Sequence, residues 1–253
     1  YDYSFSKLLD ATDIDIILVG DSLGMVSLGH ENTLAVTLEN MIDHTRAVKR
    51  GARRALVVGD MPFMSYQVSV EQAVTNAGRL IQEGGASAVK LEGGARMADR
   101  VQAIVQAGIP VMGHIGLTPQ SVHQFGGYKV QGKNYLGSRQ IRQDARDLQN
   151  AGIFAVVMEC IPGELAEEIT AELKIPTIGI GAGIKCDGQI LVLHDLLGLN
   201  QDFVPKFVKQ YAQLADSLKS AVSEYIQEVR TETFPEQEHT YHSKQGVLKQ
   251  VND

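Results

Sequence analysis

Carboxylates stand at the ends of several short apolar runs in this chain of 253 residues. Asp21, Asp60 and Glu92 each close such a run. If the runs are neighbouring parallel strands, three negative charges would lie close together, which is unfavourable unless a cation neutralises them. Oxygen ligands without thiolates or grouped imidazoles suit a hard cation, so we expect Mg²⁺, or Mn²⁺, to bind here. Taken singly, each carboxylate could instead cap the helix that follows it.

Three further residues near the ends of these runs could act on a substrate. Lys90 stands two residues before Glu92, so both side chains point to the same side of an extended strand. Lys90 could hold an anionic group or stabilise an enolate beside the metal, or it could form a plain ion pair. Glu159 could be a general base or another structural or ligand carboxylate. His114 could donate a hydrogen bond to the substrate or the base, or fill a polar site.

The elements that would position these residues are short β-branched apolar runs that alternate with helix-like stretches. The runs are continuous, which is typical of parallel strands buried on both faces. We expect strands at residues 14–19, 55–59, 88–91, 110–113, 154–158, 177–180 and 190–193. We expect helices at residues 37–50, 69–83, 97–106, 139–150 and 164–173.

This alternation predicts an α/β fold with a parallel sheet, either doubly wound or closed into a barrel. No dinucleotide-binding fingerprint follows the first run, because the glycines around Asp21 have the wrong spacing. The length and the even repeat favour a (βα)₈ TIM barrel with additional C-terminal helices. Seven strands are predicted where a barrel needs eight, so we expect the first strand to lie before Tyr1.

A single domain is expected over residues 1–253, with the barrel core at 1–200, a helical region at 201–233 and a polar tail at 234–253. Within it, residues 203–229 have the apolar periodicity of one long amphipathic helix, which would pack on the barrel or contact another subunit. The glycine-punctuated loop 120–131 is expected to cover the mouth of the barrel.

Composition narrows the classes of partner. The net charge of −7 argues against a nucleic-acid partner, which would favour a basic surface. No apolar run is long enough to span a membrane, so we expect no membrane span, and since no basic-then-apolar segment opens the sequence we expect no signal peptide. Two cysteines, Cys160 and Cys186, are too few for a disulfide scaffold and suit a reducing cytosol, so we expect a cytoplasmic protein.

The chain resembles the ketopantoate hydroxymethyltransferase family through eight motifs that occur in order, between Tyr1 and about His242. The motifs are residues 1–5 (YDYSF), 19–24 (VGDSLG), 60–64 (DMPFM), 89–94 (VKLEGG), 113–121 (GHIGLTPQS), 125–132 (FGGYKVQG), 178–183 (IGIGAG) and 187–192 (DGQILV). The wider relatives are the phosphoenolpyruvate mutase and isocitrate lyase barrels.

The resemblance implies a cytoplasmic barrel that assembles as a decamer. It implies transfer of a one-carbon unit from 5,10-methylenetetrahydrofolate to C3 of 3-methyl-2-oxobutanoate, through an enolate, which gives 2-dehydropantoate for pantothenate and coenzyme A synthesis. It implies Mg²⁺ ligands at Asp21, Asp60 and Glu92, and a proton acceptor at Glu159. The expected substrate contacts, with a histidine added from the residue pattern, are Asp21, Ser22, Asp60, Lys90 and His114.

Two other functions stay open at this point. A Mg²⁺-dependent C–C lyase of the mutase and isocitrate lyase type would bring a reactive cysteine on a mobile loop, and the loop at 126–129 has none. A non-catalytic barrel that binds a 2-oxo acid would be expected to lose a metal ligand or the base, yet all of these residues are present. Proton exchange at C3 without folate would separate an enzyme from a binding protein.

Overall fold

Seven parallel strands form one sheet in the order β1-β2-β3-β4-β5-β6-β7, in a computed structural model that describes residues 1–201 and 203–243. The strands are β1 (Ile16–Val19), β2 (Leu56–Asp60), β3 (Ala88–Glu92), β4 (Val111–Gly116), β5 (Ala155–Glu159), β6 (Thr177–Ile180) and β7 (Gly188–Gln189). Consecutive strands are neighbours throughout, with no reversal of order. Because right-handed crossovers in this order all lie on one face, the topology is that of a barrel and not of a doubly wound sheet.

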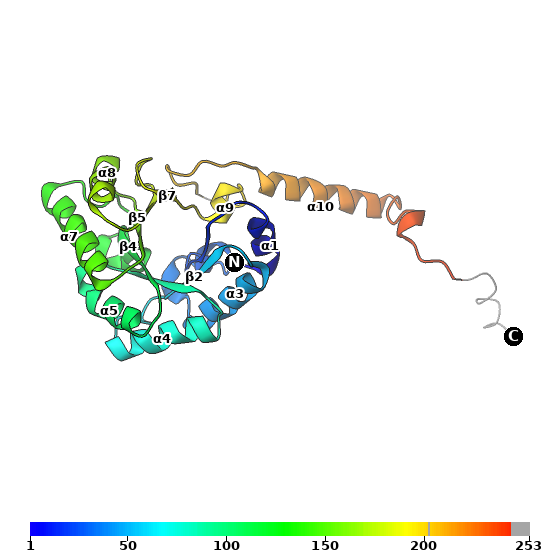
Figure 1. Cartoon of the computed structure of the whole chain (residues 1–253). Helices are drawn as coiled ribbons and strands as arrows, with labels where there is room; N and C mark the ends of the chain where they lie inside the picture. The colour runs from blue at the N-terminus through cyan, green and yellow to red at the C-terminus, as the bar shows by residue number, and fades with distance from the viewer. Residues whose placement is uncertain (202, 244–253) are drawn as a thin grey trace. The chain divides into compact units, whose positions relative to one another are not determined.

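Helices cover the outer side of the curled sheet (Figure 1). Those that follow strands β1 to β5 are α3 (Leu38–Gly51), α4 (Val70–Gln82), α5 (Ala98–Gln106), α7 (Tyr135–Ala151) and α8 (Gly163–Glu172). The remaining helices are α1 (Tyr3–Asp10), α2 (Leu23–Val26), α6 (Val122–Phe125), α9 (Leu193–Leu196) and α10 (Leu214–Arg230), with 3₁₀ turns η1 (Thr33–Ala35), η2 (Ala95–Met97), η3 (Pro119–Ser121) and η4 (Gln237–His239). The predicted α/β barrel-type fold is confirmed, while the strand expected before Tyr1 stays a prediction.

The core has two layers because strand side chains alternate between the faces of the sheet. The outer layer packs against the helices and includes Val57, Val89, Leu80 and Leu148. The inner layer is a separate cluster, made of Val58, Ala88, Met112, Ala155, Val157 and Ile178. Two residues further along each strand, the same inner face carries polar side chains, which are Asp60, Lys90, His114 and Glu159. The pleat therefore turns an apolar interior into a polar cluster at the carboxyl ends of the strands.

Local caps fix where the helices begin. The Ser69 hydroxyl accepts a hydrogen bond from Gln72 N at 3.1 Å, at the predicted start of α4. Thr37 and Asn40 form a reciprocal capping box at the start of α3. Helix α7 begins at Tyr135, four residues before the predicted start, because Asn134 caps it by accepting from Gly137 N at 2.8 Å.

Three sequence predictions need correction. The last strand lies at Gly188–Gln189 and not at 190–193, because the backbone pairing with β6 begins at the glycine, before the apolar run. The helix predicted over 203–229 begins only at Leu214, since the preceding segment bonds back to α9 through Tyr211 N and Leu196 O, 2.8 Å apart. Residues 3–10, for which we predicted no element, form α1 under an Asp2 cap.

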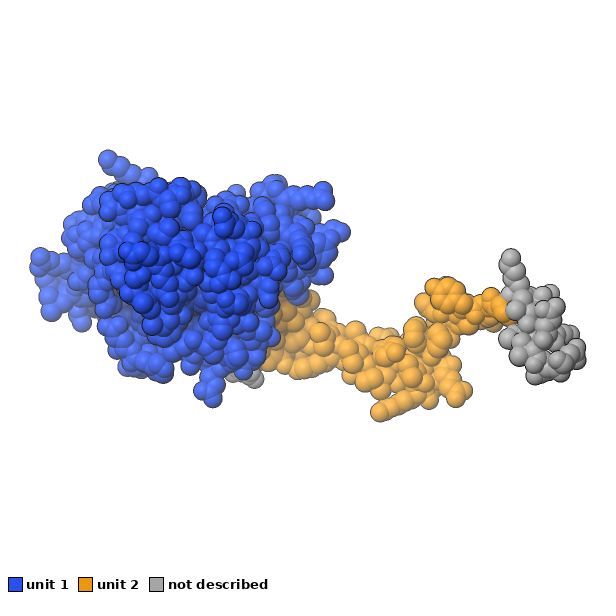
Figure 2. Space-filling model, turned by 90° about the horizontal axis from the view of Figure 1, so that it is seen from below, with its two compact units in different colours: residues 1–192, 205–208 blue, residues 193–204, 209–253 orange. Residues whose placement is uncertain are grey.

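The chain divides into two compact units (Figure 2). The first comprises Tyr1–Val192 with Pro205–Val208 and holds the sheet and every predicted site residue. The second comprises Leu193–Val204 with Lys209–Asp253 and holds α9 and α10. The single-domain interpretation with its internal boundaries stays a prediction; its tail lies partly outside the described residues, at 244–253. None of the helices described is both long and apolar enough to cross a membrane.

Candidate active site

The carboxyl ends of β1 to β5 bring the predicted site residues together. Asp21 and Ser22 follow β1. The other predicted site residues lie at or near the ends of β2, β3, β4 and β5. Five of the side chains belong to residues less than 5% exposed, which are Asp21, Asp60, Lys90, Glu92 and His114. The Glu159 side chain is 15% exposed. The cluster is therefore buried except at its carboxylate on β5.

A chain of polar contacts crosses four strands. Lys90 Nζ lies 2.9 Å from Asp60 Oδ1 and 3.2 Å from His114 Nδ1. On the other side of the ring, His114 Nε2 lies 3.1 Å from Glu159 Oε2. Because an ammonium group can only donate, His114 Nδ1 accepts, which puts the proton of the neutral ring on Nε2, beside Glu159 Oε2. Burial, and then the Lys90 charge, lower the pKa of His114, which agrees with this neutral imidazole.

The buried carboxyl groups outnumber the one lysine among them, so their ionised forms are disfavoured without a further cation. Burial, and then Asp60, raise the pKa of Asp21 to about 7. Burial, and then Asp21, raise the pKa of Glu92 well above its usual range. Burial lowers the pKa of Lys90, but Asp60 and the other carboxylates outweigh this and raise it, so the lysine stays charged. Such a site has the electrostatic character of one that binds a further cation.

Protein donors contact at least one oxygen of each carboxylate in the proposed ligand set, and both oxygens of Asp60, whose Oδ1 lies 2.9 Å from Lys90 Nζ. Asp21 Oδ2 accepts from Gln120 Nε2 at 2.9 Å, and Asp60 Oδ2 accepts from Asp21 N at 3.1 Å. Glu92 Oε2 accepts from Gln120 N at 2.9 Å. The buried, all-oxygen donor set fits a hard divalent cation. Its oxygens are not all mutually within 4.8 Å, so the three side chains share a site without converging on one point.

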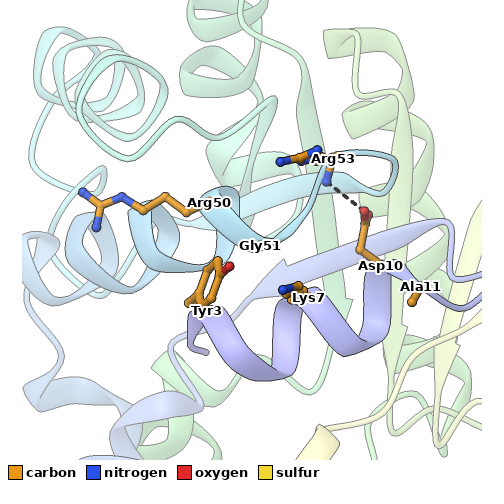
Figure 3. A pocket seen from close by; sticks show the side chains of 7 residues that line it. All are labelled: Tyr3, Lys7, Asp10, Ala11, Arg50, Gly51 and Arg53. Atoms are coloured by element: carbon orange, nitrogen blue, oxygen red, sulfur yellow. Dashed lines mark hydrogen bonds between the residues drawn. The ribbon is translucent and has the colours of Figure 1, made fainter.

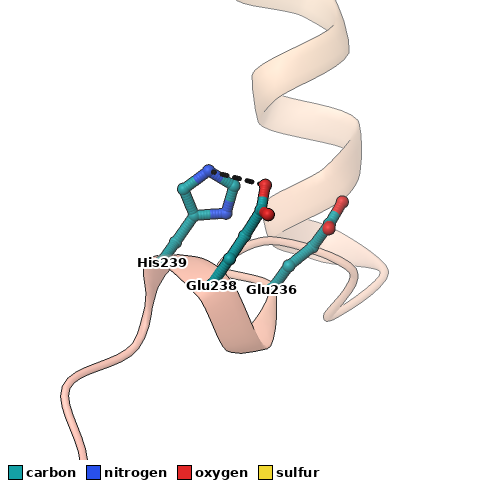
Figure 4. Close-up of side chains that lie close together, drawn as sticks. All are labelled: Glu236, Glu238 and His239. Atoms are coloured by element: carbon teal, nitrogen blue, oxygen red, sulfur yellow. Dashed lines mark ion pairs between the residues drawn. The ribbon is translucent and has the colours of Figure 1, made fainter.

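Among the residues described, the one group that brings three potential ligand atoms within 4.8 Å of one another is Glu236, Glu238 and His239 (Figure 4). All three are exposed, and His239 Nε2 lies 3.7 Å from Glu238 Oε1. They are neighbours on one 3₁₀ turn, so their proximity follows from the local backbone. Exposed acidic groups of this kind are common without a metal.

Two residues of the site were missed by the sequence analysis. Gln120 was predicted to begin a cover loop, yet it is only 5% exposed and bonds to the carboxylates of two strands. Tyr66 is 1% exposed, and its hydroxyl lies 2.7 Å from Gln120 Oε1. A neutral residue in a loop gives no charge or periodicity signal. Gln120 is therefore part of the site and not of the predicted cover loop. Further along that loop, Tyr128 is 52% exposed and its hydroxyl contacts the sulfur of Met25 on α2.

A pocket of about 440 Å³ lies away from this cluster, between α1 and the end of α3 (Figure 3). It is lined by Tyr3, Lys7, Asp10, Ala11, Arg50, Gly51 and Arg53. It contains none of the predicted site residues. Within it, Asp10 accepts from the backbone N–H groups of Arg53 at 2.9 Å and Ala55 at 2.8 Å, which fixes the start of β2.

The parallel sheet, the outer helices and the charged residues at the strand ends together define an α/β enzyme of the TIM-barrel type. The chain belongs to the ketopantoate hydroxymethyltransferase family, whose sequence model matches residues 1–237. The resemblance seen in the motifs is thereby confirmed.

Relatives of high identity extend over nearly the whole chain. One is a 3-methyl-2-oxobutanoate hydroxymethyltransferase from Syntrophus aciditrophicus (strain SB), 58% identical over 241 residues, which are 95% of this chain and 89% of the relative. The protein of the same name from Clostridium botulinum (strain Loch Maree / Type A3) is 58% identical over 251 residues, covering 99% of this chain and 91% of the relative.

Solved structures of distant proteins share the fold. A phosphonopyruvate hydrolase in complex with oxalate and Mg²⁺ has a TM-score of 0.60 at 10% identity, covering 94% of this chain and 85% of the other. Dihydrodipicolinate synthase from Aquifex aeolicus has a TM-score of 0.50 at 17% identity, covering 93% and 76%. At such low identity these likenesses support the barrel architecture alone.

Proposed function

We propose that this chain transfers a hydroxymethyl group from 5,10-methylenetetrahydrofolate to 3-methyl-2-oxobutanoate and forms 2-dehydropantoate. The observation that carries the proposal is 58% identity to 3-methyl-2-oxobutanoate hydroxymethyltransferases over 95% or more of the chain. The buried contacts from Asp60 through Lys90 and His114 to Glu159 support it, because they supply groups that such a reaction needs.

Asp21, Asp60 and Glu92 are the proposed ligands of Mg²⁺, with Mn²⁺ as the alternative. When bound, the ion would withdraw electron density from the 2-oxo acid and make its C3 proton more acidic. The excess of buried carboxylates over lysines supports this assignment. Zinc is disfavoured, since the donors are carboxylate oxygens and neither thiol belongs to the cluster.

Glu159 is the proposed base that removes the C3 proton. Its Oε2 lies 3.1 Å from Nε2 of the neutral His114, which leaves Oε1 to take the proton. Lys90 keeps its positive charge in the buried site, where it stabilises negative charge on the enolate oxygen. The enolate carbon then forms the new C–C bond with the one-carbon unit, water supplies the hydroxyl oxygen, and tetrahydrofolate leaves as the bonds from its nitrogens to that unit break.

Ser22 is proposed to donate a hydrogen bond to the substrate carboxylate. Its Oγ lies 2.6 Å from the hydroxyl of Tyr1, and when Tyr1 is the donor the Ser22 proton is left for the substrate. Ser22 follows Asp21 directly, which places the hydroxyl next to a proposed metal ligand. This neighbourhood suits a ligand that offers both a carboxylate and a keto oxygen.

Deuterium exchange at C3 of 3-methyl-2-oxobutanoate, followed by NMR in D₂O without folate, tests the first half of the reaction. We expect exchange that requires Mg²⁺, and 2-dehydropantoate as the product once 5,10-methylenetetrahydrofolate is added. A folded protein that binds the 2-oxo acid but exchanges no proton would be a binding protein, and the proposal would be wrong.

We also propose that the enzyme is a cytoplasmic homo-oligomer, a decamer by family resemblance. Exposed apolar residues on α10 support self-association, among them Leu218, Val222 and Tyr225. Both cysteines are free thiols, as suits a reducing compartment. Light scattering after gel filtration tests the assembly, because a chain of 27.5 kDa and a tenfold assembly differ clearly in mass.

A further inference from the structure

Gln120, on the turn that follows β4, connects the ends of three other strands. Its side-chain Nε2 donates to Asp21 Oδ2 and to the carbonyl oxygen of Met61, each at 2.9 Å. Its backbone N–H donates to Glu92 Oε2 at 2.9 Å. A single buried residue therefore holds carboxylates that follow β1 and end β3, and it bonds to the backbone next to Asp60.

The orientation of the Gln120 amide is fixed from both ends. Both hydrogens of Nε2 are used, and Oε1 lies 2.7 Å from the Tyr66 hydroxyl and 3.2 Å from Gln67 Nε2. A flipped amide would set its oxygen against the Asp21 carboxylate and the Met61 carbonyl. It would also point Nε2 toward the Gln67 donor. All four hydrogen-bonding positions of the amide thus enforce one orientation.

Tyr66 is anchored in turn by β3. Its hydroxyl accepts from Glu92 N at 3.1 Å, and its one proton has two acceptors, of which Gln120 Oε1 at 2.7 Å is nearer than the Glu92 carbonyl oxygen at 3.1 Å. The pair Tyr66 and Gln120 therefore forms a rigid bridge between the carboxylates of Asp21 and Glu92.

The bridge leaves part of each carboxylate available. Asp21 Oδ2 and Glu92 Oε2 accept from Gln120. Asp21 Oδ1 accepts no hydrogen bond from the described residues, and Glu92 Oε1 lies 3.6 Å from His114 Nδ1, which carries no proton in this tautomer. Each carboxylate is thus fixed through one oxygen, with the second left for a cation. Outer residues that orient metal ligands in this manner strongly affect metal affinity.

We propose that Gln120, held in place by Tyr66, is a positioning residue that sets the separation of the Asp21 and Glu92 carboxylates and thereby the affinity of the site for a divalent cation. The inference rests on the metal site of the proposed function, but it does not depend on which reaction that site performs.

The test is titration of the whole protein with MnCl₂ in a calorimeter. Gln120→Leu removes the amide at similar size, and we expect the Mn²⁺ dissociation constant to rise about 10- to 100-fold. Tyr66→Phe removes only the hydroxyl, and we expect a rise of about fivefold from the lost hydrogen bond. Matched controls on the exposed face of α7, Gln143→Leu and Tyr135→Phe, should leave the dissociation constant unchanged.

A second readout separates positioning from general damage. The Mn²⁺ concentration that gives half-maximal C3 exchange should rise by the same factor as the dissociation constant. The exchange rate at saturating Mn²⁺ should stay near that of the parent protein. A variant that merely lost folded protein would show a lower plateau with an unchanged midpoint.

Each outcome decides the inference. Unchanged Mn²⁺ affinity in folded Gln120→Leu and Tyr66→Phe overturns it, and so does a parent protein that binds no Mn²⁺. If Gln120→Leu loses its cooperative thermal unfolding, Tyr66→Phe alone decides. If the parent protein shows no exchange and no transferase activity while the affinity pattern holds, the proposed function fails and the inference stands.

Discussion

His114 Nε2, on β4, lies 3.1 Å from Oε2 of Glu159, at the end of β5. The other nitrogen of this imidazole accepts from Lys90 at 3.2 Å, so the charge of the lysine fixes the tautomer of the histidine. The histidine in turn fixes one oxygen of the least buried carboxylate in the site. The proposed base is therefore oriented by a buried cation that it does not touch.

Glu159→Gln should separate binding from proton removal. The amide keeps the size of the side chain but cannot take a proton, so we expect 2-oxo acid binding to stay nearly intact. C3 exchange should slow by about 10²- to 10⁴-fold, the usual contribution of a general base. NMR in D₂O measures the exchange, and calorimetric titration with 3-methyl-2-oxobutanoate measures the binding.

Glu164→Gln is the matched control, because Glu164 is exposed in the first turn of α8 and has the same chemistry. It should exchange at the parent rate. If Glu159→Gln also exchanges at that rate, another group removes the proton and the role assigned to Glu159 is wrong.

Asp60 and Lys90 form a buried ion pair at 2.9 Å, with side chains 1% and 4% exposed. Asp60→Asn leaves the lysine without its nearest counter-charge, so we expect the free energy of unfolding to fall by about 3 kcal/mol. The double variant Asp60→Asn with Lys90→Met should not recover this loss, because Lys90 is also the buried counter-charge of Asp21 and Glu92. Urea unfolding of the metal-free protein measures both values.

The exposed pair Arg46 and Asp43, 3.2 Å apart, provides the comparison. Asp43→Asn should change the free energy of unfolding by less than about 1 kcal/mol. Equal losses in Asp60→Asn and Asp43→Asn would mean that the buried pair contributes no more than a surface pair.

The strand ends could be predicted from sequence because the inner and outer faces of each strand are both apolar. Such strands give continuous runs, and a polar residue at the end of a run stands out, as with Asp60 and Glu159. The prediction of the last strand was wrong because the two residues that form it are not apolar. Gly188 and Gln189 pair through their backbones, and neither belongs to the apolar run that follows.

The contacts within the site could not be predicted in the same manner. The contact between Lys90 and His114 depends on the register between β3 and β4, which pairs Glu92 with His114 and so places Lys90 diagonally opposite the histidine. Gln120 meets Asp21 across 99 positions of sequence, and nothing local to either residue indicates the contact. Charge and spacing found the ionisable groups, while the neutral residues that hold them required the structure.

Mg²⁺ should stabilise the folded protein through the carboxylates at the strand ends. At about 100 times its dissociation constant, we expect the ion to raise the unfolding temperature by about 5 to 10 °C. Asp21→Asn should lose most of this shift, because one proposed ligand is then neutral. Differential scanning calorimetry with MgCl₂ against EDTA measures it.

Glu238→Gln controls for the exposed group on η4, which also offers carboxylates to a metal. This variant should keep the full Mg²⁺-dependent shift. If it loses the shift while Asp21→Asn keeps it, the cation binds outside the barrel and the ligand assignment is wrong.

Asp10 should make folding stability depend on acid pH. Hydrogen bonds from the backbone N–H groups of Ala55 and Arg53, at the start of β2, lower the pKa of its carboxyl below 3.8 in the folded protein. A carboxyl whose pKa is lowered by folding stabilises the fold above its unfolded pKa, and this contribution disappears as pH falls through the folded value. Asp10→Asn should therefore be less stable than the parent at pH 7, with the difference shrinking below pH about 4.

Urea unfolding of both proteins at several pH values measures this difference, and the other carboxyl groups, common to both, cancel. Asp13→Asn is the matched control, because its exposed carboxylate accepts no hydrogen bond from the described residues. It should match the parent at every pH. A stability difference for Asp10→Asn that is as large at pH 3 as at pH 7 would show that the contacts of Asp10 matter through shape and not through charge.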